Sequence, residues 1–406
     1  MDFLSASFLA SRWKNLKIIL SGLYYILSVP LIAQSNHSLL DSLKYELSQP
    51  VADTNRVKLY LELGQQYEGK QVDSAIYYYK QAGKLSRKMN YLAGIIKYIA
   101  YYTEVLNHQG KFGEALQLNL EAVKLARQNN LKLPLAKSLV NTAVSYQYLA
   151  DFQTSLKYYL QAMPIFEELK FENGLFILYS NLCGLYGQTL EEYDKALFYG
   201  NKALQLAQKQ NNLYGIASAQ LNKGIVFTRM KRYSEALAAI QEGYRIGKKL
   251  ENLYLQETAL ANTGDIYLHQ KQYARVIPIA NETLKLAKIL GDTEGQAIAL
   301  GGLASAYFYT KNYSKAKQYA EQAVVLCREN QLRDELRNKI MQLSHIELAM
   351  GNLPAYNKLW AEGDSLDKAI LNEKLRVNLQ ELDAKYQSAK KENQIKTLQK
   401  EKQIQV

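Results

Sequence analysis

The sequence contains little cysteine. Of its 406 residues, only Cys183 and Cys327 carry thiols, so the chain lacks the cysteines of a disulfide framework. Three units of the repeat described below separate the two residues, which is too far for the Cα spacing that a disulfide allows. We therefore expect both side chains to be buried as small apolar groups.

Histidine and the motifs of catalysis are also scarce. No two of the four histidines have the spacing of metal ligands: His37, His108, His269 and His345. A nucleophile elbow, a phosphate-binding loop and a Cys/His cluster are missing. The paired Gly301 and Gly302 fall within an expected helix, where they cannot form a turn that cradles phosphate. The sequence therefore predicts no enzyme activity, no cofactor and no metal site.

Alternation of apolar and polar residues with a period of two is absent, which argues against half-buried strands. The apolar spacing is helical instead. In the stretch 221–243, Leu221, Gly224 and Phe227 share one helical face. After a short break, a second helical face follows, formed by Ala236, Ile240 and Gly243. Apolar residues spaced in this way are typical of amphipathic helices, so the sequence predicts an all-α chain.

The sequence repeats itself every forty residues. Corresponding positions follow one another in steps of 40, with a single step of 41: Ala75, Ala115, Ser155, Ala196, Ala236, Val276, Ala316 and Tyr356. Such self-similarity is typical of folds in which each unit is a hairpin of helices that cannot bury its apolar face alone. We predict a stack of hairpins whose functional surface extends over several units.

A small residue precedes an aromatic residue by three positions in most units: Gly64 and Tyr67, Ala143 and Tyr146, Cys183 and Tyr186, Gly224 and Phe227, Gly264 and Tyr267, Ala304 and Tyr307. A small side chain lets two helix axes approach closely, and the aromatic ring one turn later fills the space beside them. Glycine inside a helix costs about 1 kcal/mol relative to alanine. Its recurrence at one position therefore predicts close contact between the two helices of each hairpin.

These residues resemble the tetratricopeptide repeat, in segments such as "LNKGIVFTRMKRYSEALAAIQEG" and "GGLASAYFYTKNYSKAKQYAEQA". The resemblance covers residues 55–363 and implies a right-handed α-solenoid of about eight helix pairs. The forty-residue unit is longer than the minimal 34, and we expect the extra residues after the second helix, in turns such as "QKQNNLYG". The fourth unit has one further residue, which we expect in the stretch 189–193. Residues 34–54 are expected to form a short helix or linker.

The first 33 residues lie outside the repeat. Three cations, Arg12, Lys14 and Lys17, precede an uncharged run from Ile18 to Ala33. This order is typical of a secretory signal peptide cleaved after Ala33. The alternative is an uncleaved membrane anchor, although the run is short for a span, which needs about 20 residues. The sequence predicts an exported protein, in the periplasm or at the outer face of the bacterial inner membrane.

Residues 364–406 read as one long charged helix. Leu375, Leu379, Leu382 and Tyr386 follow the 4-3-4 spacing of a coiled coil, which suggests a homodimer through this helix. The segment resembles the one that joins exported tetratricopeptide sensor regions to the membrane span of bacterial histidine kinases and related regulators. That resemblance implies a membrane-associated signalling partner.

The chain is basic, with a formal net charge of +12. A basic balance can indicate a nucleic-acid partner. Here, however, lysine and arginine are spread along helix faces with acidic residues between them, as in "RIGKKLE". We therefore expect a solvated surface and no nucleic-acid partner.

An asparagine recurs two residues before the small position in four successive units: Asn141, Asn181, Asn222 and Asn262. The resemblance implies that this position faces the concave groove, as in peptide-binding relatives such as kinesin light chains. An amide side chain can pair with both the C=O and the N–H of a peptide backbone. The alternative is that each asparagine bonds to a neighbouring helix and sets the repeat geometry. The candidate neighbours in the groove are Lys97, Lys137, Tyr148 and Asp265.

Two functions remain open, and a third possibility is a cytoplasmic regulator that keeps residues 1–33 intact. The first is a non-enzymatic scaffold that binds a peptide or protein segment in the concave groove, on a preformed surface. The second is the sensory input module of a membrane-bound signalling protein, in which binding changes the superhelix and the C-terminal helix transmits the change.

Overall fold

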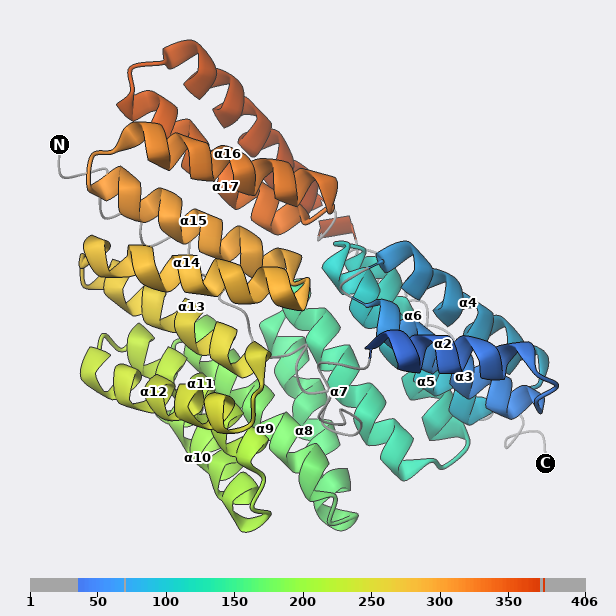
Figure 1. Ribbon diagram of the computed structural model, residues 1–406. Coiled ribbons are helices and arrows are strands. Elements are labelled where there is room, and N and C mark those ends of the chain that lie inside the picture. The colour runs from blue at the N-terminus through green and yellow to red at the C-terminus, as the bar shows by residue number, and fades with distance from the viewer. Residues whose placement is uncertain (1–35, 69–70, 373–374, 377–406) are drawn as a thin grey trace, which may run out of the picture.

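The computed structural model describes residues 36–68, 71–372 and 375–376. All regular structure within these residues is helical, and the predicted α-solenoid of helix pairs is confirmed. Figure 1 shows the hairpins following one another along a curved path. A helix that precedes the repeats, α2 (Asn36–Ser48), packs on the first hairpin.

Each unit consists of a first and a second helix. The first helices are α3 (Asp53–Tyr67), α5 (Leu92–His108), α7 (Lys132–Tyr148), α9 (Glu172–Gly184), α11 (Leu213–Arg229), α13 (Leu253–His269), α15 (Thr293–Tyr309) and α17 (Arg333–Ala349). The second helices are α4 (Val72–Lys88), α6 (Phe112–Gln128), α8 (Phe152–Glu168), α10 (Tyr193–Lys209), α12 (Tyr233–Lys249), α14 (Tyr273–Leu290), α16 (Tyr313–Glu329) and a terminal helix over 353–372.

A left-handed residue ends nearly every helix and sets the period. Asn130 has φ +52° after α6, and Ala150 has φ +60° after α7. The N–H of Leu131 bonds to the C=O of Ala126 at 2.9 Å, and that of Asn130 bonds to Arg127 at 3.3 Å. This is the Schellman pattern, which satisfies the last carbonyls of a helix.

The forty-residue period of the repeat comes from long helices and short turns. Most helices have 17 residues and most turns have three, both within a hairpin and between hairpins. The expectation that the extra residues lie in longer turns after the second helix is therefore wrong. Tight Schellman turns leave no room for additional residues, so both helices are lengthened instead.

The fourth unit accommodates its additional residue inside a helix. We expected this residue in the stretch 189–193, but α9 ends at Gly184 and continues as the π-helix η2 (Leu185–Thr189). The N–H of Glu192 then reaches the C=O of Tyr186, six residues back, at 2.9 Å. A π turn takes up one more residue than an α turn, so the turn that follows keeps the form found in the other units.

The contacts between helices define an inner and an outer layer. Consecutive first helices pack on one another as well as on their own partners, as α11 does on α13 and α13 on α15. The second helices make no comparable contacts among themselves in the described chain. The first helices therefore form the concave inner layer. Among consecutive first helices of the described residues, α7 and α9 alone lack a comparable contact, and the path of the solenoid bends there (Figure 1).

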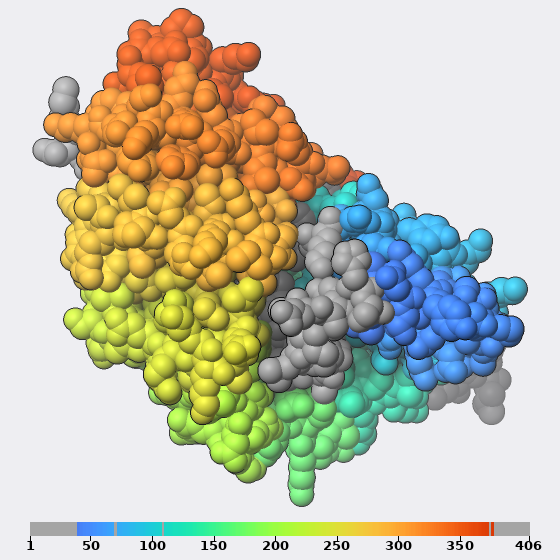
Figure 2. Space-filling view, in the orientation of Figure 1, coloured from blue at the N-terminus to red at the C-terminus, as the bar shows by residue number. Residues whose placement is uncertain are grey.

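The curved path brings distant units together. A Cβ built on Gly110, in the turn between α5 and α6, would lie 3.3 Å from Cδ of Arg333 at the start of α17. Figure 2 shows the orange C-terminal units beside the blue and teal N-terminal ones. The turn between α5 and α6 and the start of α17 therefore lie close together.

Small residues permit close helix contact in some units and are not needed in others. A Cβ added to Gly224 would lie 2.5 Å from Cγ1 of Ile240 and 3.3 Å from the backbone oxygen of Ala236. A Cβ on Gly264, at the same position of the next unit, would lie 3.6 Å from Ile279, an ordinary contact distance. As predicted, both cysteines are free and buried: Cys183 and Cys327.

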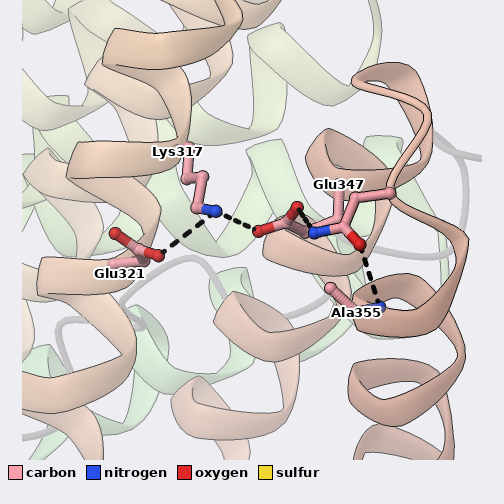
Figure 3. A network of polar contacts seen from close by, with 5 residues as sticks. Lys317, Glu321, Glu347 and Ala355 are labelled. Carbon is pink, nitrogen blue, oxygen red and sulfur yellow. Dashed lines mark hydrogen bonds and ion pairs between the residues drawn. The ribbon is translucent and has the colours of Figure 1, made fainter.

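A buried carboxylate joins the seventh and eighth units. Glu347 on α17 pairs with Nζ of Lys317 on α16 at 2.7 Å and accepts a hydrogen bond from Nδ2 of Asn352 at 2.9 Å. Lys317 also lies 3.9 Å from Glu321, and Oδ1 of Asn352 accepts the N–H of Ala355 at 3.4 Å (Figure 3). Glu347 is buried, so its partners compensate the cost of desolvating a charge. The network fixes the start of the terminal helix.

Two carboxyl groups lie close together in the first two units. The hydroxyl of Tyr79 donates to Oε1 of Glu68, and burial raises the pKa of Glu68 to about 7. Burial, and then the neighbouring Glu68, raise the pKa of Glu104 on α5 well above its ordinary value. The folded chain therefore binds protons here that the unfolded chain releases.

We expect Gly224→Ala and Gly264→Ala to change stability in opposite directions. Overpacking against Ile240 costs about 1–3 kcal/mol, which outweighs the gain of about 1 kcal/mol in helix propensity. Only the gain applies at Gly264, because its neighbours leave room for a Cβ. Thermal unfolding should give a lower Tm for the first variant and a higher Tm for the second. Shifts of the same sign would show that the small position does not control helix contact.

Stability should fall between about pH 4.5 and pH 7 through the Glu68 site. The folded-state pKa of Glu68 is raised, so its protonated form is retained on folding and the contribution is lost as pH rises through the folded pKa. The loss is about 1.4 kcal/mol for each unit by which the pKa is raised. Glu68→Gln should flatten the profile of Tm against pH relative to the exposed control Glu114→Gln. Parallel profiles for the two variants would contradict the assignment.

Candidate functional site

The four recurring asparagines all lie on first helices, but they do not form one continuous row. Asn181, Asn222 and Asn262 lie on α9, α11 and α13, which pack consecutively in the inner layer. Asn141 on α7 is separated from them where α7 and α9 lack contact. The exposed fractions of the three contiguous side chains are 3%, 8% and 5%. The contiguous part of the site therefore spans three helices.

Asn181 contributes to the packing of the solenoid. Its side chain hydrogen-bonds to the hydroxyl of Tyr159 on α8. Tyr159 in turn donates to Oε1 of Gln147 on α7, at 2.6 Å. The buried network links three helices across the junction between the third and fourth units. At Asn181 the asparagine therefore bonds to a neighbouring helix, which is the alternative to peptide binding considered above.

Asn262 lies in a different environment. Together with Asp265 it lines a shallow hollow between α11 and α13, which Ile225, Thr228 and Arg229 complete from α11. Nδ2 of Asn262 and Oδ1 of Asp265 are buried and have no hydrogen-bond partner within the described chain. Buried polar atoms are nearly always paired in native proteins. An unpaired donor and an unpaired acceptor that line one hollow mark a candidate binding point.

The charges around Asp265 are partly balanced. Burial raises the pKa of Asp265, and the neighbouring His269 and Arg229 act in the opposite direction. Nε2 of His269 lies 3.6 Å from Oδ2 of Asp265. The imidazole ring also stacks on Tyr233, with centroids 6.4 Å apart. Thr228 donates to the C=O of Gly224 at 2.9 Å, so it is bound to its own helix.

The predicted lysines come together on the inner layer. Lys97 on α5 is exposed and Lys137 on α7 is half-buried. Burial, and then the charge of Lys97, lower the pKa of Lys137. Nζ of Lys137 lies 5.3 Å from the ring centroid of Phe171 at the start of α9. The pair forms a basic area on the N-terminal side of the position where α7 and α9 lack contact.

Tyr148 lies at the end of α7, close to residues of the last two units. Its ring stacks on Phe112, with centroids 5.3 Å apart. Burial, and then the charges of Glu294, Glu104 and Asp334, raise its pKa. Because Glu294 and Asp334 belong to the last two units, Tyr148 lies where both ends of the solenoid approach each other.

The sequence reasoning did not identify Arg229, Thr228 and Ile225. A signal for Arg229 was present, because it lies at the position of Tyr148 two units later, and His269 follows it after forty residues. Extending the Tyr148 position along the repeats would have found the cation beside Asp265. Ile225 corresponds in the same way to Asp265 itself.

Several predictions concern residues or groups beyond this site. The predicted signal peptide of residues 1–33 lies outside the described residues, and so does most of the predicted charged helix of residues 364–406. In the part of the chain that the structure describes, no helix combines the length and apolar character that a membrane span requires. Nor do three or more His, Cys, Asp or Glu side chains gather there as potential metal ligands.

Comparisons with known proteins agree with the repeat architecture. A tetratricopeptide repeat model matches residues 174–249 and 255–329. No curated protein sequence matches the chain. Among solved structures, the chain is similar to a Rap protein complexed with Competence and Sporulation Factor. The two are 15% identical, the match covers 83% of this chain and 93% of that one, and the TM-score is 0.58.

Two further structures are similar. NprR in complex with its cognate peptide NprX is 15% identical, with 82% of this chain and 98% of that one covered and a TM-score of 0.51. A signal transduction ATPase with a tetratricopeptide repeat sensor from Pyrococcus horikoshii is 20% identical, with coverages of 86% and 56% and a TM-score of 0.51. At these identities the likeness shows a shared fold. Residues 174–249 and 255–329 thus match the tetratricopeptide repeat, and the stacked hairpins of the described chain have the same architecture as these structures.

Proposed function

We propose that the chain is a non-enzymatic interaction scaffold that binds an extended peptide segment along the inner layer of α9, α11 and α13. The observation that carries the proposal is the recurrence of an amide side chain at one position of three contiguous first helices. An amide offers a donor and an acceptor, which match the C=O and N–H of a peptide backbone.

The neighbouring groups favour a peptide over a rigid folded partner. The turn after α5 lies close to the start of α17, and an extended chain needs little room between them. Two structures of the same fold are complexes, one with Competence and Sporulation Factor and one with a cognate peptide. At one end of the asparagine row, Nδ2 of Asn262 and Oδ1 of Asp265 have no hydrogen-bond partner in the part of the chain that the structure describes.

A sensory input module remains the second candidate. It is favoured by the closeness of Gly110 to Arg333, because a ligand that changes their separation would move α17. Lys317, Glu347 and Asn352 would pass that movement to the terminal helix. Export of the chain, a membrane-associated signalling partner and a homodimer through the charged helix belong to this proposal.

The scaffold is tested with an array of ten-residue peptides, acetylated and amidated, whose sequence is varied systematically. We expect a subset to bind, with the Kd of each measured by fluorescence anisotropy. Asn222→Ala should weaken binding by about tenfold, because it removes one or two hydrogen bonds of about 0.5–1.5 kcal/mol each. Its Tm should remain close to that of the unsubstituted protein.

The matched control is Asn201→Ala, which removes an exposed amide on α10, a helix of the outer layer. It should leave both Kd and Tm unchanged. An array without any bound peptide would contradict the proposal, and so would equal losses of affinity in the two variants. A large fall in Tm for Asn222→Ala would show instead that this asparagine serves the packing of the repeats, as Asn181 does.

A further inference from the structure

The junction between the third and fourth units has the least extensive packing in the stack. Among the described residues, α7 and α9 lack the contact that joins every other pair of consecutive first helices. The packing of α8 on α9 is also less extensive than that of any other second helix on the first helix that follows it, even with η2 included. The junction therefore divides the described chain into an N-terminal body, α2 to α8, and a C-terminal body, α9 to the terminal helix.

The two bodies are held together where α8 passes into α9. The ring centroids of Phe166 and Phe171 lie 5.7 Å apart. A Cβ added to Gly174 would lie 2.7 Å from Cδ1 of Phe166, so the first turn of α9 approaches α8 closely. Two bodies that touch along one restricted contact can rotate about it, which is the geometry of a hinge.

A buried hydrogen-bonded side chain links α7 to α9 across this junction. Tyr159 on α8 is fully buried, donates to Oε1 of Gln147 on α7 at 2.6 Å and hydrogen-bonds to the side chain of Asn181 on α9. Hydrogen bonds weaken steeply when their angle changes. The network therefore favours one orientation of α7 relative to α9, at a junction where these two helices do not pack on each other.

The far ends of the two bodies approach each other through polar groups. Cδ of Arg333 on α17 lies 3.3 Å from the Cβ position built on Gly110, between α5 and α6. Tyr148 at the end of α7 lies close to Glu294 and Asp334 of the C-terminal body. Exposed charged groups contribute little when they pair, because water replaces the partner at small cost. This approach of the two ends therefore opposes separation of the bodies only weakly.

We infer that the solenoid is a clamp, which opens and closes by rotation of the two bodies about the contact between α8 and α9. The inference does not depend on the proposed peptide binding. Asn181, Asn222 and Asn262 belong to the C-terminal body, whereas Lys97 and Lys137 belong to the N-terminal body. The hinge therefore sets whether the two parts of the predicted groove face a ligand together.

Distances between spin labels on the outer layer of the full chain test the hinge, by double electron–electron resonance. Gln117→Cys with Ala238→Cys places labels on α6 and α12, three units apart and on opposite sides of the junction. The matched control, Asn201→Cys with Glu321→Cys, places labels on α10 and α16, three units apart within the C-terminal body. All four side chains are exposed.

The native thiols allow selective labelling. Cys183 and Cys327 are buried, and burial raises the pKa of each thiol to about 12. Both therefore stay protonated at neutral pH, and the protonated thiol is not the reactive form. The chain without introduced cysteines should take up no label, which checks this point before the distances are measured.

We expect the distance distribution of the junction pair to be about twofold wider than that of the control pair, because the junction pair alone reports rotation of one body against the other. Two narrow distributions of equal width would overturn the inference, since the junction would then be rigid. Two equally wide distributions would also overturn it, since bending would then be spread along the whole stack.

Tyr159→Phe tests the network that favours one orientation at the junction. The variant keeps the ring and loses the hydrogen bonds to Gln147 and Asn181. We expect the distribution of the junction pair to broaden further and that of the control pair to stay unchanged. Equal changes in both pairs would contradict the inference. Far-UV circular dichroism verifies that the variant folds, and the comparison of the two pairs in the chain with native Tyr159 decides the matter if it does not.

Discussion

The structure depends on one constraint: a hairpin of two 17-residue helices has more apolar surface than it can bury by itself. Each hairpin must therefore pack on the next, and the chain extends by addition of units without enlarging a single core. The left-handed residue after nearly every helix keeps the turns at three residues, so the apolar faces return in register every twenty residues. The π-helix of the fourth unit shows the strength of this requirement, because an extra residue is absorbed without disturbing the turn that follows.

The same constraint creates the candidate site. First helices pack on one another, whereas second helices spread apart, and the difference curves the stack around an inner layer. A residue type that recurs once per unit is therefore displayed as a row on that layer. The gap between α7 and α9 divides the row, which makes Asn181, Asn222 and Asn262 the continuous portion. Within it the asparagines differ, since Asn181 is bound to Tyr159, whereas Nδ2 of Asn262 has no hydrogen-bond partner among the described residues.

Much of the fold could be predicted from the sequence because the same hairpin pattern occurs in eight copies. The helices, their pairing and the buried cysteines follow from the positions of small and apolar residues. The placement of the extra residues could not be predicted, because helix lengthening and longer turns give the same spacing. The position of the asparagine row was also predicted, but its division was not, since contact between α7 and α9 depends on helix orientation. The hollow brings Asp265 together with Arg229 from the preceding unit. The sequence of a single unit does not predict this contact between units.

Hydrogen exchange of the intact chain, followed by mass spectrometry on peptides from each helix, tests nearest-neighbour stacking most directly. Stacking predicts graded protection: α9 to α14 have neighbours on both sides and should exchange slowly, while α3, α4 and the terminal helix should exchange faster. The network at Glu347 should slow α17 relative to the terminal helix. A single rate of opening shared by all helices would indicate one cooperative core and would contradict the stacked architecture described here.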